Sequence, residues 1–219
     1  MKKENKMPTV FEKRGALIAQ KVVENLKSRK FDAYFVENAK DAVEKAISLI
    51  PKGSVVSWGG SMTLVEIGMQ ERIYKEGFTV IDRDKAKDPQ ERAELSRKAL
   101  LSDVYLTSTN AISQDGVLIN TDGFGNRVAA MTFGPKSVIV IAGINKICKT
   151  LEEAYLRVKN HASPLNAARL SLTKTACAST GFCQDCKSDE SVCSFTVQTR
   201  MSKVPGRMKV IIVGENLGY

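Results

Sequence analysis

The sequence is poor in the residues and patterns on which several functional classes depend. It holds a single histidine, His161, and a single tryptophan among 219 residues. A Ser–His or Cys–His catalytic pair would have to use His161, and the chain has no G-x-S-x-G motif, so conventional hydrolase chemistry is not expected. A lone histidine near the end of an expected helix is more often a capping or surface residue than a catalyst.

Long apolar runs are also missing. No segment approaches the roughly 20 apolar residues that cross a bilayer, and no apolar run of signal-peptide length follows the charged N-terminus. The sequence therefore predicts a cytoplasmic protein, in a compartment where thiols are kept reduced and structural disulfides are rare. The content of 43% hydrophobic and 26% charged residues is that of an ordinary globular protein.

The formal net charge is +9, but the lysines and arginines are scattered along the chain. Such an excess favours anionic partners in general, among them phosphates and carboxylates. No run resembles a zinc finger, a basic zipper or an aromatic RNA-binding stretch, so nucleic acid is not the expected partner. A small anionic molecule fits the composition better.

Apolar periodicity and turn signals predict strands that alternate with helices. Strands are expected at 31–36, 53–58, 78–82, 103–108, 137–143, 194–200 and 208–215. Helices are expected at 9–30, 39–50 and 62–76, and three more begin near Asp88, Thr150 and Ser163. Two further strands, 116–120 and 127–132, would flank the turn-rich "TDGFGN" as a hairpin. The alternation predicts an α/β fold with a mainly parallel sheet flanked by helices, in one domain over 1–219 with a cysteine-rich loop at 177–193.

A first candidate site follows the expected strand that ends at Trp58. Gly59 and Gly60 turn the chain, and a helix begins at Ser61. Glycines allow close approach of the backbone to a ligand, and a helix N-terminus favours an anion. The alternative is a tight strand-to-helix turn with Ser61 as a plain N-cap, and the pattern is neither a Rossmann fingerprint nor a Walker loop.

A second candidate site lies in the polar stretch 107–135. Its candidate ligand-binding residues are Thr109, Asn110, Thr121, Asp122, Gly123 and Arg127. Thr109 and Asn110 follow a buried strand, where ligands of α/β proteins bind, and Arg127 could clamp a carboxylate or phosphate. Asp122 could act as a general base, although no partner for it is evident. Asp115 and Gly116 are better explained by turn chemistry.

Four of the five cysteines fall within "CASTGFCQDCKSDESVC": Cys177, Cys183, Cys186 and Cys193. Cys183 and Cys186 form a compact chelating pair, and the other two are near enough in sequence to complete a four-sulfur site. Structural zinc, an iron–sulfur cluster, a redox-active pair and free thiols all remain open. The fifth, Cys148, follows a buried strand and reads as a small core residue.

Several stretches together are similar to the LUD domain family, that of lactate utilization protein C. They are "VVSWGGSMTLVEIG", "RKALLSDVYLTSTNAISQDGVLINTDGFGNRVAAMTFGP", "VIVIAGINKI" and "NHASPLNAARL". The resemblance covers nearly the whole chain, and the cysteine cluster is a subgroup addition to it. It implies a fold like that of CoA-transferases and ribose-5-phosphate isomerase, and a role in oxidising lactate or a similar carboxylate beside iron–sulfur partner subunits.

Three hypotheses follow from these observations. The first is a protein that binds a small anion through the two candidate sites and holds a metal or cluster on the four cysteines. The second is an isomerase or acyl-CoA transfer enzyme, for which Glu66 is the nearest candidate nucleophile. The third is a non-catalytic assembly subunit with structural zinc. The sequence alone leaves open whether the domain is catalytic.

Overall fold

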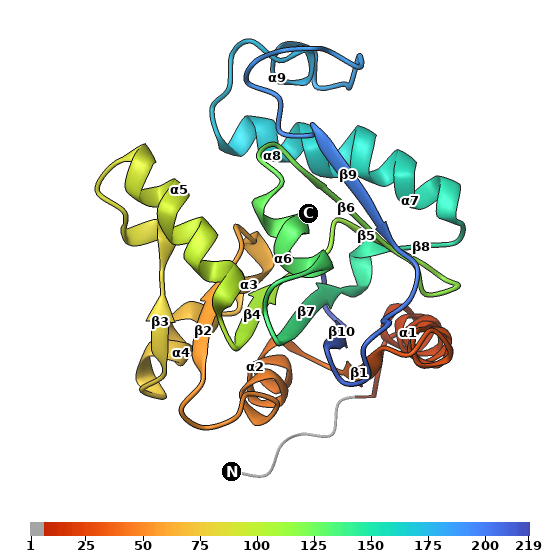
Figure 1. The fold of residues 1–219 in the computed structure, drawn as a ribbon. Helices are drawn as coiled ribbons and strands as arrows, with labels where there is room; N and C mark the ends of the chain where they lie inside the picture. The colour runs from red at the N-terminus through yellow and green to blue at the C-terminus, as the bar shows by residue number, and fades with distance from the viewer. Residues whose placement is uncertain (1–6) are drawn as a thin grey trace.

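The computed structural model describes residues 7–219, in which helices and strands alternate along most of the chain (Figure 1). The strands are β1 Asp32–Val36, β2 Val55–Trp58, β3 Thr79–Ile81, β4 Val104–Thr107, β5 Ala111–Ser113, β6 Leu118–Asp122, β7 Ser137–Gly143, β8 Ile147–Cys148, β9 Phe195–Thr199 and β10 Met208–Val213. The α-helices are α1 Val10–Ser28, α2 Ala39–Ser48, α3 Met62–Glu66, α4 Met69–Lys75, α5 Pro89–Lys98, α6 Asn126–Thr132, α7 Leu151–Arg157, α8 Ser163–Arg169 and α9 Ala176–Thr180. Three 3-10 turns span Arg83–Lys85, Ala99–Leu101 and Ile144–Lys146, and a π-helical segment spans Val158–Ala162. No helix in this part of the chain is long and apolar enough to cross a membrane.

The main sheet has six strands in the order β1-β10-β7-β4-β2-β3, and every neighbouring pair is parallel. The predicted α/β class with a mainly parallel sheet is therefore confirmed. Parallel strands end at one edge of a sheet, so the segments that follow β2, β3, β4 and β7 all emerge on the same side. This edge positions the candidate site.

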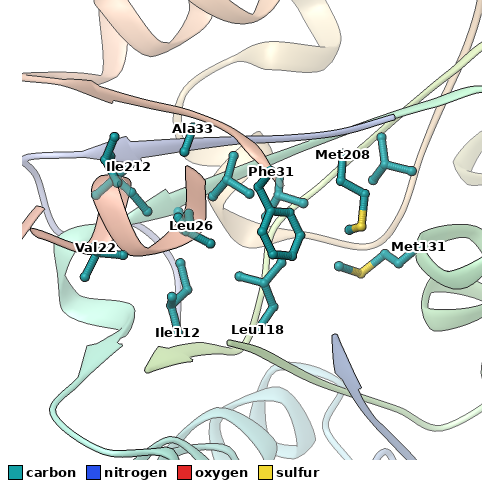
Figure 2. Close-up of a cluster of buried hydrophobic side chains, with 14 of the residues drawn as sticks. Val22, Leu26, Phe31, Ala33, Ile112, Leu118, Met131, Met208 and Ile212 are labelled. Atoms are coloured by element: carbon teal, nitrogen blue, oxygen red, sulfur yellow. The ribbon is translucent and has the colours of Figure 1, made fainter. Parts of the chain in front are cut away.

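Helices and a second sheet cover the two faces of the main sheet. Helices α2, α3 and α4 pack on one face around Trp58, Leu64 and Ile139. On the other face, α1 and α6 pack together with strands of the second sheet (Figure 2). Burial on both faces explains why β7 is a continuous apolar run without polar alternation.

The second sheet has four strands in the order β8-β5-β6-β9 and is mixed in direction. Ile112 and Leu118 point from it into the core that it shares with α1 and the main sheet (Figure 2). Its other face packs against Ala154 of α7 and Val158 of the π-helical segment that follows it. The hydrophobic core is thus continuous from the main sheet to the second one.

Local helix signals are confirmed where the sequence predicts them. The side chains of Asp88 and Thr150 accept hydrogen bonds from the backbone N–H groups of Glu91 at 2.8 Å and Glu153 at 3.1 Å. Such bonds satisfy N–H groups that have no partner within the helix. Gly77 follows the end of α4 at a φ of +75°, a left-handed conformation that glycine adopts readily.

Three local predictions were wrong. The segment 127–132, expected as a strand, lies within helix α6, because it begins after Gly125 in the left-handed conformation and Asp122 caps its first turn. The hairpin lies one strand earlier, between β5 and β6, and turns at Gly116. The helix expected over 62–76 breaks at Gly68, whose φ of +66° ends α3.

Candidate functional site

A cavity of about 510 Å³ lies at the edge of the main sheet where the parallel strands end. Loops after four of these strands contribute to its wall: Gly60 after β2, Arg83 after β3, Ser108 after β4 and Lys146 after β7. All but one of the ligand-binding residues expected from the sequence line it, namely Gly60, Ser61, Thr109, Asn110, Thr121, Asp122, Gly123 and Arg127. Two stretches about 50 residues apart in the sequence thus meet at one site.

The glycine turn after β2 brings the backbone close to two cationic side chains. Gly59 is buried beside Arg127, and a Cβ at this position would lie 3.0 Å from Arg127 Cδ and 3.0 Å from the Tyr105 hydroxyl. A Cβ on Gly60 would lie 2.6 Å from Nη2 of Arg83. The two glycines therefore leave room for side chains of the site, and Gly59 itself lies behind the cavity wall.

Ser61 acts as the N-cap of α3, and its hydroxyl accepts the N–H of Leu64 at 3.3 Å. Helix α3 has only five residues, so its dipole is small. The anion-binding character expected from a helix N-terminus is therefore weak here. Charged side chains around the cavity carry it instead.

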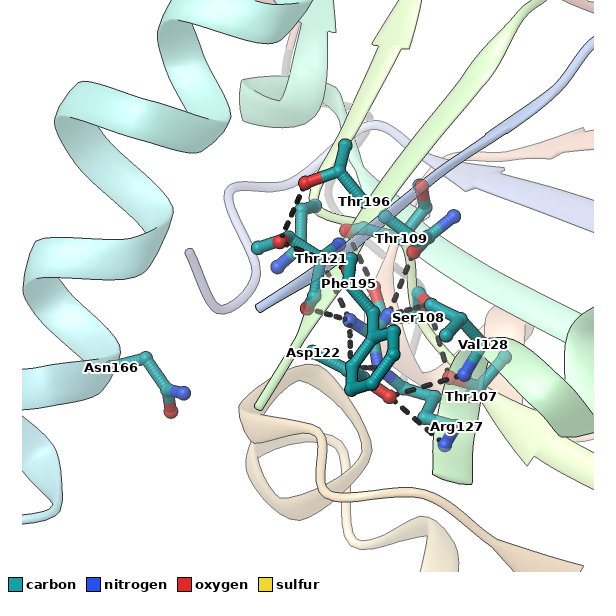
Figure 3. Close-up of polar contacts among 12 residues, drawn as sticks. Thr107, Ser108, Thr109, Thr121, Asp122, Arg127, Val128, Asn166, Phe195 and Thr196 are labelled. Atoms are coloured by element: carbon teal, nitrogen blue, oxygen red, sulfur yellow. Dashed lines mark hydrogen bonds and ion pairs between the residues drawn. The ribbon is translucent and has the colours of Figure 1, made fainter. Parts of the chain in front are cut away.

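Arg127 is the centre of a buried polar network (Figure 3). Its side chain is 10% exposed, and each of its five N–H groups donates to an oxygen of the protein. The acceptors are Asp122 Oδ1, Ser108 O, Asn120 Oδ1, Asn110 Oδ1 and Thr121 O, at 2.7–3.3 Å. With its donors committed in this way, Arg127 joins β6, α6 and the loop after β4 into one rigid wall.

Both carboxylate oxygens of Asp122 also have hydrogen-bond donors within the protein. Its Oδ2 accepts the backbone N–H groups of Arg127 and Val128 at the start of α6, at 2.9 and 3.1 Å. Its Oδ1 lies 2.8 Å from Arg127 Nη2 and also accepts from Arg127 Nε. A carboxylate with these partners caps a helix and pairs a cation, which leaves little capacity for general-base work.

The threonines expected at the site are also held by the protein. Thr109 is buried and donates to the carbonyl of Ala111 at 3.0 Å. The Thr121 hydroxyl lies 2.9 Å from that of Thr196 on β9 (Figure 3). These contacts bind the cavity floor to the second sheet.

Arg83 is a site residue that the sequence reasoning missed. Its side chain is 14% exposed and lines the cavity, and its Nε is buried with no hydrogen-bond acceptor in the described part of the chain. The nearest carboxylate oxygen, Asp84 Oδ1, is 3.9 Å away. Its position in the sequence could have indicated it, because Arg83 directly follows the strand expected at 78–82 and ligands of α/β proteins bind where strands end.

Lys146 is a second missed residue, and it also follows a buried strand. It is 2% exposed, and its Nζ donates to Thr63 Oγ1 at 3.0 Å and to Ser108 Oγ at 2.9 Å. Burial lowers the pKa of Lys146 to about 7, and the nearby charges of Arg157 and Arg127 act in the same direction. A buried lysine of this kind is typical of functional sites.

The four clustered cysteines line one separate cavity of about 300 Å³. The buried hydroxyl of Ser163 also lines it and has no hydrogen-bond partner in the described chain. Hydrogen bonds from the backbone N–H groups of Ala176 and Ser188 lower the pKa of the Cys186 thiol. Over residues 7–219, however, no three side chains of the His, Cys, Asp or Glu type stand close enough to hold a metal ion. The metal site expected from the sequence stays a prediction.

The cysteine loop also forms one wall of the larger cavity. Ser191 and Val192 line both cavities, and Asp189 and Glu190 line the larger one. A Cβ on Gly123 would lie 2.8 Å from the carbonyl oxygen of Ser191. The loop is therefore packed directly against the end of β6.

Other residues singled out from the sequence lie outside the larger cavity. His161 is exposed on the π-helical segment, and Cys148 is half-buried against the core between the second sheet and α7. Glu66 is exposed, and its Oε2 accepts the Gly218 N–H at 2.6 Å. Asp115 lies in the β5–β6 turn, where it pairs with Arg29 at 2.6 Å.

The model of the LUD domain family matches residues 19–213. The chain belongs to the LUD domain family. A crystal structure of a DUF162 family protein from Deinococcus radiodurans is similar to this LUD-domain chain at 16% identity and a TM-score of 0.54, over 91% of this chain and 98% of that one. At this identity the likeness bears on the fold alone. A structure of eIF2B delta from Chaetomium thermophilum is 18% identical, with a TM-score of 0.31 over 64% of this chain and 55% of that one. No curated protein matches the sequence.

Proposed function

We propose that this LUD-domain protein binds a small organic anion, lactate or a carboxylate of similar size, in the cavity at the strand ends. The observation that carries the proposal is the buried Nε–H of Arg83, which has no acceptor in the described chain although its side chain lines the cavity. An unmade hydrogen bond of a buried charged group is costly. A ligand carboxylate would supply the missing acceptor.

The charges around the cavity also support an anion. Among the described residues that line it are four arginines and Lys146 but only three acidic residues. Two of the acids already have partners: Asp122 pairs with Arg127, and Glu190 accepts the backbone N–H groups of Thr173 and Lys174. Clustered cations in a cleft raise the local concentration of anions.

Some residues of the site would contact the anion, and others would form the walls of the cavity. Arg83 and the exposed Arg169 would contact the anion, and Gly60 and Ser61 would form the wall beside it. Asn110, Thr121, Asp122 and Arg127 would act as a rigid floor, because their mutual hydrogen bonds fix their positions. Preorganised sites of this kind lose little entropy on binding.

Calorimetric titration with lactate, pyruvate and phosphate tests this proposal. The Arg83→Met variant should bind the preferred anion about 10- to 100-fold more weakly, the range expected for one charged hydrogen bond. Arg97→Met is the matched control, since Arg97 is 68% exposed on α5 and pairs only with Glu94 among the described residues. Equal affinity of the Arg83→Met variant and the wild type would contradict the assignment.

We further propose that Cys177, Cys183, Cys186 and Cys193 hold an iron–sulfur cluster or a zinc ion. Four thiols around one cavity, beside the unpartnered hydroxyl of Ser163, support this. A cluster would carry electrons between the anion and iron–sulfur partner subunits, in keeping with a role in oxidising lactate or a similar carboxylate. A zinc ion would instead fix the loop, as in a non-catalytic assembly subunit.

Metal analysis and an absorption spectrum of protein purified without oxygen distinguish these alternatives. A coloured protein with iron supports the cluster, and a colourless one with zinc supports the structural ion. The Cys183→Ala variant should lose the bound metal, whereas Cys148→Ala should keep it. Protein with neither metal would refute the site.

An isomerase or acyl-CoA transfer activity is the second candidate function. Glu66, the expected nucleophile, is not among the described residues that line the cavity. The geometry therefore favours anion binding over transfer through this carboxylate. A thermal shift with acyl-CoA esters or sugar phosphates that exceeds the shift with lactate would reverse this order.

A further inference from the structure

Lys146 is a buried amine that simple anion binding does not require. It lies in the 3-10 turn Ile144–Lys146 directly after β7, is 2% exposed and lines the larger cavity. Arginines already supply charge to this cavity. A buried lysine that faces a polar cavity therefore calls for a separate explanation.

The two hydrogen-bond partners of Lys146 determine how many N–H groups its nitrogen donates. Thr63 Oγ1 donates its own proton to the carbonyl of Leu217 at 3.2 Å, and Ser108 Oγ donates to the carbonyl of Thr109 at 3.4 Å. Both hydroxyls therefore accept hydrogen bonds from Nζ. A neutral amine has two N–H groups and one lone pair, so both N–H groups are used and the lone pair is left over.

The surroundings favour the neutral form of this amine. Burial is the main cause of its low pKa, and the charges of Arg157 and Arg127 add to it, whereas Glu66 opposes it. The pKa of about 7 means that a large share of Lys146 is unprotonated at neutral pH. Neutral lysines in low-dielectric sites serve as bases or as nucleophiles toward carbonyl groups.

We propose that Lys146 is the nucleophile of the cavity and forms an imine with a small 2-oxo acid, whose carboxylate the arginines hold. This deepens the proposed function, since it rests on anion binding in the same cavity. A 2-oxo acid has both groups that the cavity addresses: a carboxylate for Arg83 and an electrophilic carbonyl carbon for Lys146. It is also the product that oxidation of a 2-hydroxy acid yields.

The step is balanced without any further reagent. The Nζ lone pair attacks the carbonyl carbon, the C–N bond forms, and the carbonyl oxygen takes up the proton that the nitrogen loses. The nitrogen lone pair then expels this hydroxyl, which takes one proton from solvent water and leaves as water, and a C=N bond with a protonated nitrogen remains. Water reverses the sequence, so the adduct is in equilibrium with the free 2-oxo acid.

Reductive trapping of the full-length protein tests the proposal. Pyruvate or glyoxylate is added with sodium cyanoborohydride, which reduces the imine to a stable secondary amine, and the modified peptide is identified by mass spectrometry. The adduct should form at Lys146, and the Lys146→Arg variant should lose at least nine-tenths of it. Lys209→Arg is the matched control, because burial also lowers the pKa of Lys209, which hydrogen-bonds Ser137 outside the cavity. An adduct distributed over exposed lysines, or none at all, would overturn the proposal.

A second comparison separates this proposal from anion binding itself. The Arg83→Met variant should need at least tenfold more pyruvate for half-maximal trapping at Lys146, with trapping by uncharged propanone unchanged. If the folded Lys146→Met protein binds lactate but the wild type forms no imine, the anion site is supported and the role of Lys146 as nucleophile is refuted. Failure of the wild type to bind any of the anions would refute the proposed function itself.

Discussion

Arg127 is the residue on which the polar wall of the site depends. Its side chain bridges β6, α6 and the loop after β4, and it neutralises Asp122, which is 11% exposed. Removing one partner of a buried ion pair leaves an uncompensated charge and several unsatisfied acceptors. The residue is therefore more important for the shape of the cavity than for direct contact with a ligand.

The Arg127→Met variant should be destabilised by about 3–5 kcal/mol, because Asp122 loses its cationic partner and Asn120 Oδ1 loses its donor. Urea denaturation measures this difference. Arg97→Met breaks an exposed ion pair at 2.5 Å and should cost less than about 1 kcal/mol. Similar losses in the two variants would show that the network contributes little.

Lys146 should make the stability of the protein depend on pH in a particular direction. The folded state releases the proton of Lys146 near pH 7 and the unfolded state near the ordinary value of 10.5. Between these values the unfolded state binds more protons, so stability rises with pH, by up to about 1.4 kcal/mol per pH unit. Below pH 7 both states are protonated, and the full cost of burying the charge is present.

The Lys146→Met variant removes this contribution. Its free energy of unfolding should exceed that of the wild type most clearly below pH 7, and the excess should shrink between pH 7 and 10. The surface change Lys21→Met on α1 serves as the control. A constant difference between Lys146→Met and wild type across this range would mean that Lys146 keeps its proton in the folded state.

At the scale of elements, one glycine in α1 and one in the β5–β6 turn should affect stability in opposite directions when replaced by alanine. Gly15 lies inside α1, and among the described residues a Cβ there would meet only Ile144 Cγ1, at 3.7 Å. Gly116 has a φ of +88°, and a Cβ there would lie 2.9 Å from the backbone of Asn25. The backbone conformation and the close neighbours at position 116 therefore require glycine, whereas those at position 15 do not.

Gly15→Ala should therefore stabilise the protein by about 0.5–1 kcal/mol, since alanine has the higher helix propensity. Gly116→Ala should destabilise it by at least about 1–2 kcal/mol, because a left-handed backbone is unfavourable for residues with a Cβ. Urea midpoints of both variants give the comparison. Destabilisation by Gly15→Ala would mean that α1 packs more tightly than the 3.7 Å contact indicates.

For the whole molecule, the main question is how the two cavities affect each other. Ser191 and Val192 line both, so an ordered cysteine loop fixes part of the wall of the anion cavity. If both cavities bind their proposed ligands, each ligand should alter the affinity for the other by the same factor. The loop would then link the state of the thiols to binding of the anion.

Loading the cysteines with metal should therefore change the affinity for the preferred anion by about fivefold or more. Calorimetric titration of loaded and chelator-treated protein measures this factor, and the anion should shift the metal affinity equally. Cys148→Ala leaves the loop intact and should behave as wild type. Equal anion affinities with and without metal would show that the two sites are independent.

The sequence by itself determined the α/β class, most strands and the helix starts at Asp88 and Thr150, since these depend on local periodicity and capping. It also selected two stretches, near Gly60 and near Asp122, that line one cavity. It did not reveal that 127–132 is helical, because that choice depends on Asp122 capping α6 from outside the helix.

Only the tertiary structure decided which side chains of the site are free. Arg127 was expected as a clamp for the ligand, but five protein oxygens occupy its donors, whereas the buried Nε–H of Arg83 beside the cavity has no acceptor in the described chain. The structure also buried Lys146 between two hydroxyls that accept from its amine. Hydrogen-bond partners and burial come from segments distant in sequence, and they determine the chemistry available to each residue.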